Sequence, residues 1–471
     1  MRAHAVLAGA LAAAVLLRLV AVLGYPSALW FGDSVGYLRS AINLEPSRTR
    51  PSGYSLLLWL LRPLHGLVAV VTVQHLLGLA TGVVLYALAR RHVRAAWPRP
   101  EWLPGVLGTA VAVPVLFDAY QIELEHLLLS DTLFTFLVVS LVAVLLWRPD
   151  VTGWTAVCAG LLLGMAAVTR TVGLPLLALV LGWLVLRGRR AALVPAVALT
   201  AACLLPVGLY MSWFHAAHRQ YAMTTAGNVF LYGRAVGFAD CRIIKPRPAL
   251  VRMCPHTPPV GISPAYASLW TDRSPFASMP GGKSGGNELA GEFAYAAIRA
   301  QPADYAWIVL RDTARAFTWE RTVYPSPWTF RKYEFPSRAK PLADRQKKVA
   351  RAYSGFTGPQ SVVEPMAGWM RGYQHRMRLP GSILGLLLLA GASGMLFVRG
   401  TWRQALLPWL TSLALLVVPA ATADFDYRYV VPAFPLGALA ALLAFVRGRR
   451  PAGRAGKRTR RTAPRTSART G

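Results

Sequence analysis

Apolar residues are concentrated in about ten runs along the chain, and polar residues fill the segments between them. Most runs are about twenty residues long, which lets a helix cross a hydrocarbon layer of ~30 Å. The pattern therefore predicts an all-α polytopic membrane protein of about ten transmembrane helices, with a large loop between the seventh and the eighth. The predicted spans cover residues 4–24, 67–90, 103–121, 127–147, 151–170, 172–187, 191–212, 381–398, 404–420 and 429–446.

The first apolar run could also belong to a cleaved secretory signal. It lacks a small-residue cleavage site before Tyr25 and Pro26, and many further runs follow it. We therefore interpret it as the first transmembrane helix.

Short loops between alternate spans are rich in arginine, and they assign a side to every loop. The basic loops cover 90–101, 147–150, 187–190 and 399–403, together with the tail from Arg447. Loops of this kind stay in the cytoplasm, so both termini are expected there. Of the 20 acidic residues, only Glu101 and Asp150 fall clearly on that side. An active site, if there is one, is therefore expected on the extracytoplasmic side.

The composition of the chain indicates the kind of organism it comes from and a partner for its basic tail. The formal net charge is +31, and Arg outnumbers Lys by 44 to 7. This bias is typical of a GC-rich bacterial genome, which would place the protein in a plasma membrane. The tail from Arg447 holds ten Lys and Arg and no acid. It could contact anionic lipids or nucleic acid, but its attachment directly after a span favours membrane lipids, and no nucleic-acid partner is expected.

These patterns divide the chain into four parts. They are an N-terminal membrane module (1–212, about seven helices), an extracytoplasmic region (213–380), a C-terminal membrane part (381–446, about three helices) and a basic disordered cytoplasmic tail (447–471).

Two segments outside the spans are expected to lie at the membrane interface. In the first outer loop, 25–66, the stretch 51–61 is rich in leucine and aromatic residues, which suits the headgroup region. In the long loop, 287–321 predicts two amphipathic helices broken at Pro302. The same loop contains Cys241 and Cys254, which could form a disulfide in an oxidising compartment or remain two unpaired thiols.

A carboxylate follows the first span directly. Asp33 lies a few residues beyond the apolar run, and Tyr37 lies about one helical turn further. Asp33 could simply cap the next helix. It could instead serve as a functional carboxylate at the outer boundary.

A second acidic group precedes the span at 127–147. If the chain is helical from residue 123, Glu123 and His126 lie on one side of the helix, with Asp131 one step further round. A carboxylate one turn below the surface is costly where it faces lipid, so Asp131 is expected to face a cavity. Glu123 and Glu125 could also be solvated loop acids.

Two arginines at outer helix ends break the positive-inside pattern. Arg170 therefore needs a local partner, either Asp131 or the phosphate of a ligand. Arg428 follows Asp424 and Tyr427 in the motif DFDYRYVVP. Phosphate binding is one hypothesis for Arg428, and a lipid-interface anchor with local ion pairing is the other.

Several motifs of the chain resemble one known family when they are taken in order. They are GDSVGYL, RPSGYSLLL, YQIELEHLLLSDTLFTFL, AAVTRTVGLPLL and DFDYRYVVPAFPLGAL. This series resembles the GT-C integral-membrane glycosyltransferases, especially the branch of aminoarabinose transferases and protein O-mannosyltransferases. The resemblance implies a GT-C-like fold, and it makes the acid of the first outer loop, here Asp33, the catalytic carboxylate. One departure is that the aminoarabinose branch has its main soluble domain after the last span.

These observations lead to the hypothesis of a glycosyltransferase at the outer membrane face. It would transfer a sugar from a polyprenyl-phosphate donor to an envelope glycan, lipid or protein by an inverting displacement. Asp33 would be the base, and Arg170 and Arg428 would bind the donor phosphate. The residues expected to shape the acceptor site are Tyr37, Glu123, His126, Asp131, Asp424 and Tyr427.

Two other classes remain open, a lipid-linked glycan flippase or transporter and a non-catalytic scaffold. Catalysis predicts that the acids and arginines converge in one cavity, whereas transport predicts polar groups through the full membrane thickness. A divalent cation could take part, but no ligand spacing is diagnostic for one.

Overall fold

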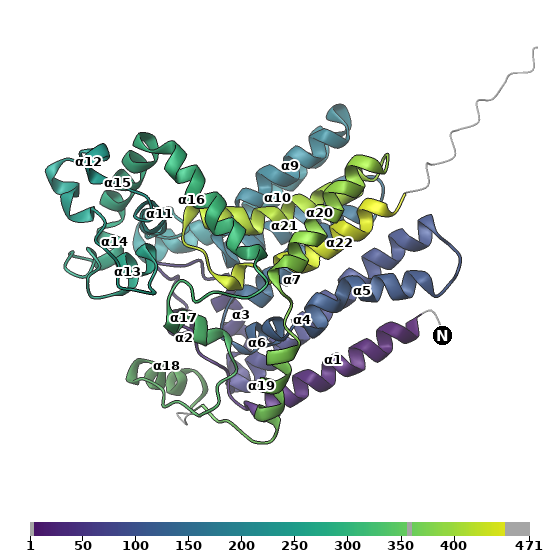
Figure 1. The fold of residues 1–471 in the computed structure, drawn as a ribbon, viewed down its shortest axis with the longest axis horizontal. Coiled ribbons are helices and arrows are strands. Elements are labelled where there is room, and N and C mark those ends of the chain that lie inside the picture. Colours follow the sequence, from purple (N-terminus) through teal and green to yellow (C-terminus); the bar gives the residue numbers. More distant parts are fainter. Residues whose placement is uncertain (1–3, 356–359, 448–471) are drawn as a thin grey trace, which may run out of the picture.

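The computed structural model describes residues 4–355 and 360–447 (Figure 1). Every regular element in this part is a helix, and one isolated β-bridge pairs Leu29 with Leu127. The predicted all-α class is therefore confirmed. The predicted basic tail, apart from Arg447, lies outside the described residues.

Apolar helices form the membrane part of the molecule. They are α1 (Ala5–Gly24), α4 (Leu67–Ala96), α5 (Leu103–Phe117), α6 (Ala119–His126), α7 (Asp131–Leu146), α8 (Gly153–Thr169), α9 (Pro175–Arg187), α10 (Arg189–His218), α20 (Gly381–Phe397), α21 (Trp402–Thr422) and α22 (Ala433–Phe445).

The lengths of these helices define a multi-pass membrane protein. Within the described residues, five helices are long and apolar enough to cross a membrane, or seven if two bent pairs each count as one span. The pairs are α5 with α6, bent by 51°, and α19 (Met366–Arg376) with α20, bent by 49°. Each predicted span contains an apolar helix. Beyond the five to seven candidate spans there are three shorter apolar helices of 10–17 residues, so ten full crossings are not confirmed.

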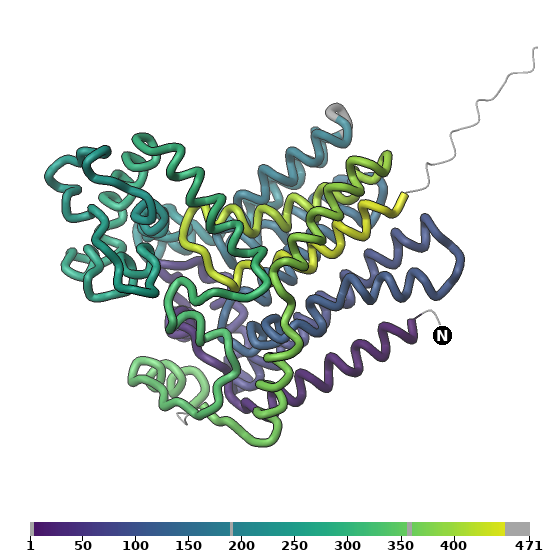
Figure 2. Tube along the Cα trace, viewed as in Figure 1, coloured from purple at the N-terminus to yellow at the C-terminus, as the bar shows by residue number. Residues whose placement is uncertain are grey.

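The membrane helices share two ends (Figures 1 and 2). One end, here called the basic end, carries the first described residues, the connection between α4 and α5, the turn between α9 and α10, and the end of α22. The opposite end carries α2, α3 and the whole segment from α11 to α19. Most of the irregular chain is therefore gathered at the end opposite the basic loops.

Shorter helices build that opposite end. They are α2 (Ser34–Asn43), α3 (Gly53–Leu61), α11 (Gly227–Ala235), α12 (Cys241–Ile244), α13 (Pro264–Trp270), α14 (Gly282–Gly285), α15 (Asn287–Ala300), α16 (Pro302–Ala314), α17 (Pro327–Phe330), α18 (Asp344–Ser354) and α19.

The segment from α11 to α15 has a hydrophobic core of its own. Tyr232 and Phe293 are among its buried side chains, and a disulfide joins Cys241 with Cys254 at its edge. The next two helices, α15 and α16, are separated at Gln301, so the break predicted at Pro302 is present. Their position at a membrane surface stays a prediction.

A buried arginine stabilises the bend between α5 and α6. The last carbonyl groups of α5 have no partners within the bent helix. Arg18 of α1 donates to Val115 O and Leu116 O, at 3.0 Å each, and to the two carboxylate oxygens of Glu125 at 2.8 and 2.9 Å. His75 of α4 lies 2.8 Å from Glu125. One ionic cluster therefore joins α1, α4 and both halves of the bent pair.

Gly78 leaves the space that the Glu125 side chain occupies. A Cβ atom at position 78 would overlap Glu125 Oε1. Because Arg18 and His75 hold the Glu125 carboxylate, it cannot turn away without losing these contacts. The glycine is therefore required by packing against a buried charge.

We expect Gly78→Ala to lower the free energy of unfolding by about 1–3 kcal/mol, the usual cost of overpacking. The measurement is the thermal midpoint of the purified protein in detergent. Gly208→Ala on α10 is the matched control, since no atom beyond its chain neighbours and the adjoining backbone of α10 lies within 4 Å of the added Cβ. Equal midpoints for Gly78→Ala and the unaltered protein would contradict this packing argument.

Candidate active site

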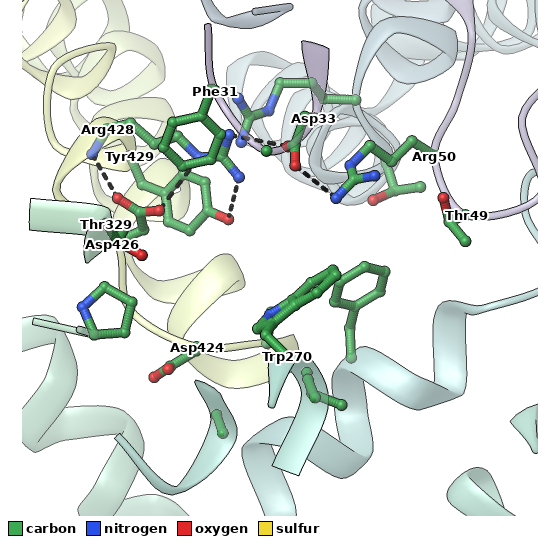
Figure 3. Close-up of a pocket in the computed structure, with 18 of the residues that line it drawn as sticks. Phe31, Asp33, Thr49, Arg50, Trp270, Thr329, Asp424, Asp426, Arg428 and Tyr429 are labelled. Atoms are coloured by element: carbon green, nitrogen blue, oxygen red, sulfur yellow. Dashed lines mark hydrogen bonds and ion pairs between the residues drawn. The ribbon is translucent and has the colours of Figure 1, made fainter. Parts of the chain in front are cut away.

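A cavity of about 560 Å³ lies at the end of the helices opposite the basic end (Figure 3). Its walls come from the loop before α2, the segment before α3, the turn after α8, the surroundings of α13 and α17, and the loop between α21 and α22. Asp33, Tyr37, Arg170, Asp424 and Arg428 all line it. Residues from opposite ends of the sequence thus meet at one site.

Asp33 is held between two arginines. Its Oδ1 lies 2.6 Å from Arg50 Nη2, and its Oδ2 accepts a hydrogen bond of 3.2 Å from Arg428 Nη1 (Figure 3). The residue is 6% exposed. Burial alone would raise the pKa of this carboxyl, but the two guanidinium groups outweigh burial and hold its pKa below the ordinary value. Asp33 is therefore ionised at neutral pH.

Asp33 occupies the N-cap position of α2 without acting as a cap. Its side chain makes no hydrogen bond to the first turn, and its backbone angles are already helical, with φ −80° and ψ −23°. Capping residues usually have extended angles and accept a bond from the first turn. The capping interpretation is therefore wrong, because the arginines take both carboxylate oxygens instead.

Backbone pairing fixes the loop that carries Asp33. Leu29 N donates to His126 O, and Leu128 N donates to Leu29 O, both at 3.0 Å. Ser34 Oγ donates to Leu128 O, also at 3.0 Å. The segment between α6 and α7 thus fixes the position of the loop that carries Asp33.

The same pairing corrects the expectation of a continuous helix from residue 123. α6 ends at His126 and α7 starts at Asp131. Glu123 and His126 are fully buried and do not line the cavity, so Glu123 is not a solvated loop acid either. His126 Nε2 donates to Tyr25 O at 2.8 Å, and its Nδ1 lies 3.2 Å from His75. His126 therefore belongs to the scaffold behind the cavity.

Two arginines meet at one aromatic ring in the cavity wall. The guanidinium carbons of Arg170 and Arg428 lie 5.1 and 5.3 Å from the centre of the Tyr429 ring. Arg170 is ion-paired with Asp131. Arg428 Nε lies 3.5 Å from Asp426, close enough for ionic attraction but without hydrogen-bond geometry. Arg428 Nε is therefore a buried donor without a hydrogen-bond partner, held by the charge of Asp426.

Asp424 lies across the opening from Asp33 (Figure 3). Its carboxylate accepts hydrogen bonds from Tyr324 and, at 2.6 Å, from Ser263, and Arg234 lies 3.9 Å away. Burial raises the pKa of Asp424, and Arg234 opposes this shift. The protein itself occupies this carboxylate, so Asp424 shapes the wall rather than offering a free base.

The two remaining predicted tyrosines have different positions. Tyr37 lines the cavity, and its hydroxyl lies 3.1 Å from that of Ser130. Tyr427 is buried and accepts a hydrogen bond of 2.8 Å from Thr322 N, and it does not line the cavity.

Arg50 and Trp270 are cavity residues that the sequence analysis did not single out. Arg50 stands directly before Pro51 in a predicted outer loop, so it breaks the positive-inside pattern as Arg170 does. That signal could have identified Arg50. Trp270 lies in the long loop, where no pattern separates it from other tryptophans.

Metal binding has little support in the residues that line this site. Across the described ranges, no group of three His, Cys, Asp or Glu side chains is placed to hold a metal ion. Both oxygens of Asp33 face guanidinium groups.

No family model matches the chain, and no curated protein matches it. The archaeal oligosaccharyltransferase AglB from Archaeoglobus fulgidus, solved in complex with an inhibitory peptide and a dolichol-phosphate, gives a TM-score of 0.43 at 11% identity. The match covers 92% of this chain, which spans 50% of that one.

ArnT from Cupriavidus metallidurans, bound to undecaprenyl phosphate, gives a TM-score of 0.35 at 14% identity. This match covers 94% of the present chain and 77% of the ArnT chain. At these identities and TM-scores, the likenesses do not place the chain in a family.

A double-mutant cycle between Asp33→Asn and Arg428→Gln tests the ion pair. We expect a coupling of about 0.5–3 kcal/mol in the free energy of unfolding, as for residues in direct contact. The measurement is unfolding of the four proteins in detergent. Arg48→Gln is the control, because Arg48 is exposed and only two positions from Arg50, and its effect should add to that of Asp33→Asn. If the effects of Asp33→Asn and Arg428→Gln on the free energy of unfolding also simply add, the ion pair is not formed.

Proposed function

We propose that the chain is a membrane glycosyltransferase that moves a hexose or pentose from a polyprenyl-phosphate donor to an acceptor. The observation that carries this proposal is an ionised carboxylate between arginines, in a cavity where apolar helices end. A lipid-linked donor needs a site at the membrane boundary, cations for its phosphate and a base for the acceptor hydroxyl. The resemblance of the sequence motifs to GT-C glycosyltransferases supports the same assignment.

The proposed reaction is a single displacement at the anomeric carbon. The acceptor oxygen bonds to this carbon as its proton passes to the Asp33 carboxylate. The bond from carbon to the phosphate oxygen breaks, and its electron pair leaves with the polyprenyl phosphate. The phosphate departs already charged, so one carboxylate suffices, and the configuration is inverted.

Arg170 and Arg428 are proposed to bind the leaving phosphate. Both border the cavity beside Tyr429, and Asp131 and Asp426 hold them in place by ionic contacts. Fixed guanidinium groups stabilise the charge that develops on the phosphate without having to reorganise. The acceptor, an envelope glycan, lipid or protein, would approach Asp33 from the remaining part of the cavity.

The basic loops give the proposed orientation. Their arginines belong in the cytoplasm, which leaves the cavity at the outer face of a bacterial plasma membrane. Both termini would then be cytoplasmic.

The distribution of buried charge favours transfer over transport. Arg18 lies six positions from Gly24, about 9 Å from the cavity-side end of α1 at 1.5 Å per residue. In the described helices, no buried Asp, Glu, Lys or Arg lies between this level and the basic end. A flippase or transporter would need polar groups along the whole path. The buried polar side chains nearer the basic end, such as Thr109 and Thr411, are uncharged and bond to carbonyl groups of their own helices.

Asp33→Asn is expected to lower sugar transfer by roughly 10²-fold or more, the scale of losing a general base. The variant should bind polyprenyl phosphate at least as tightly, because the arginines lose a competing anion. The measurements are donor turnover and lipid binding by the purified protein in lipid. Near-normal turnover would leave Asp33 with an ion-pairing role alone.

Arg170→Ala and Arg428→Ala should each weaken polyprenyl-phosphate binding by roughly tenfold or more, since a charge-assisted hydrogen bond contributes ~1.5–3 kcal/mol. Lysine at either position should restore only part of the affinity, because it lacks the planar fork of arginine. Calorimetric titration measures both effects, and Arg48→Ala serves as the exposed control. Unchanged affinity in both alanine variants would remove the phosphate assignment.

A further inference from the structure

Lys283 lies at the edge of the cavity with its ammonium group against an aromatic ring. Its Nζ lies 3.1 Å from the centre of the Trp270 ring, and Trp270 itself lines the cavity. In the described part of the chain, Lys283 makes no ion pair of its own. Burial and the neighbouring Arg50 lower the pKa of this ammonium group to about 8, and the Asp33 carboxylate, which forms no ion pair with Lys283, opposes this shift only in part. An incompletely solvated cation without a carboxylate partner favours an anion supplied from outside.

Lys283 and Arg50 lie against the same Trp270 ring, and Thr225 joins the two segments that carry them. Thr225 N donates to Arg48 O at 2.7 Å, and Thr225 Oγ1 lies 3.1 Å from Ser284 Oγ. Thr225 thus links the segment before α3 to α14, the short helix that carries Lys283 and Ser284. Gly281, directly before α14, has a φ of +72°, a conformation that residues with a Cβ rarely adopt, so the chain can turn there into the helix that carries Lys283.

Arg50 and Arg428 divide the cavity into two sides. They contact opposite oxygens of Asp33, and Figure 3 shows them on either side of that carboxylate, with Trp270 facing the Arg50 side. The proposed function assigns the Arg428 side to the donor phosphate. The Arg50 side also carries positive charge, and it belongs to the part of the cavity left for the acceptor.

We propose that Lys283, Arg50 and Trp270 form a second anion subsite, which receives a negatively charged group separate from the phosphate at Arg428. This inference rests on the proposed glycosyl transfer. A carboxylate or phosphate fits the subsite. Lys283 and Arg50 carry positive charge and only hydrogen-bond donors, and these anions offer only acceptors. The group belongs either to the acceptor or to a second phosphate on the donor lipid.

The test compares Lys283→Gln with Lys283→Arg and with Lys347→Gln. Lys347 is an exposed lysine on α18, so its loss controls for the change in net charge. Calorimetric titration with polyprenyl phosphate and polyprenyl diphosphate probes a second donor phosphate. Titration with glycerol 3-phosphate against glycerol, in the presence of polyprenyl phosphate, probes an anionic acceptor.

A second donor phosphate predicts that the unaltered protein binds the diphosphate more tightly than the monophosphate. Lys283→Gln should then weaken diphosphate binding by roughly tenfold and leave monophosphate binding unchanged. An anionic acceptor predicts unchanged lipid binding and a similar loss for glycerol 3-phosphate alone. Lys283→Arg should retain most of either affinity, and Lys347→Gln should have no effect.

Lys283→Gln that alters neither comparison would overturn the second subsite. The proposed function can fail separately. If Arg170→Ala and Arg428→Ala both leave polyprenyl-phosphate binding intact, the donor assignment is wrong whatever Lys283 does. If these variants lose binding while Lys283→Gln changes nothing, only the second anion subsite is removed.

Discussion

The structure depends on the requirement that an ionised side chain buried among its helices have a counter-charge. Arg18 and Glu125 meet this requirement where α5 bends into α6. The guanidinium group also takes two carbonyl oxygens that the bend leaves free. Removing either partner would leave an uncompensated charge in a medium of low dielectric, which costs about 3–5 kcal/mol. The pair therefore fixes α6, and α6 sets the path of the segment that follows.

That path determines where the catalytic carboxylate of the proposed reaction lies. The chain after α6 pairs with Leu29, and Ser34 is bonded to Leu128, so the loop before α2 has a fixed backing. Asp33 then reaches Arg428 across a sequence separation of 395 residues. Arg428 has its own support in the nearby Asp426, which accepts a hydrogen bond from Tyr333. Each of the two loops is therefore fixed by contacts other than the ion pair between Asp33 and Arg428.

The sequence predicts those parts of this arrangement that local pattern controls. Apolar runs locate the membrane helices, and Pro302 locates a helix break. An arginine at an outer helix end identifies Arg170 and Arg428 as residues that need an anion. The interruption after His126 could not be predicted, because it depends on backbone pairing with Leu29, a partner remote in the sequence. Glu123 was misplaced for the same reason, since the assumed continuous helix put it beside the cavity.

Donor binding and base strength are coupled in this site if the proposed reaction is right. Arg428 now contacts Asp33, and with Arg50 it holds the pKa of that carboxyl low, which makes Asp33 a weak base. A phosphate that binds Arg428 adds a second anion to the same guanidinium and reduces its effect on Asp33. The proton affinity of Asp33 then rises, because the carboxylate has lost part of its stabilisation. Without the donor, Asp33 is a structural counter-ion, and it becomes an effective base only when the phosphate that must leave is in place.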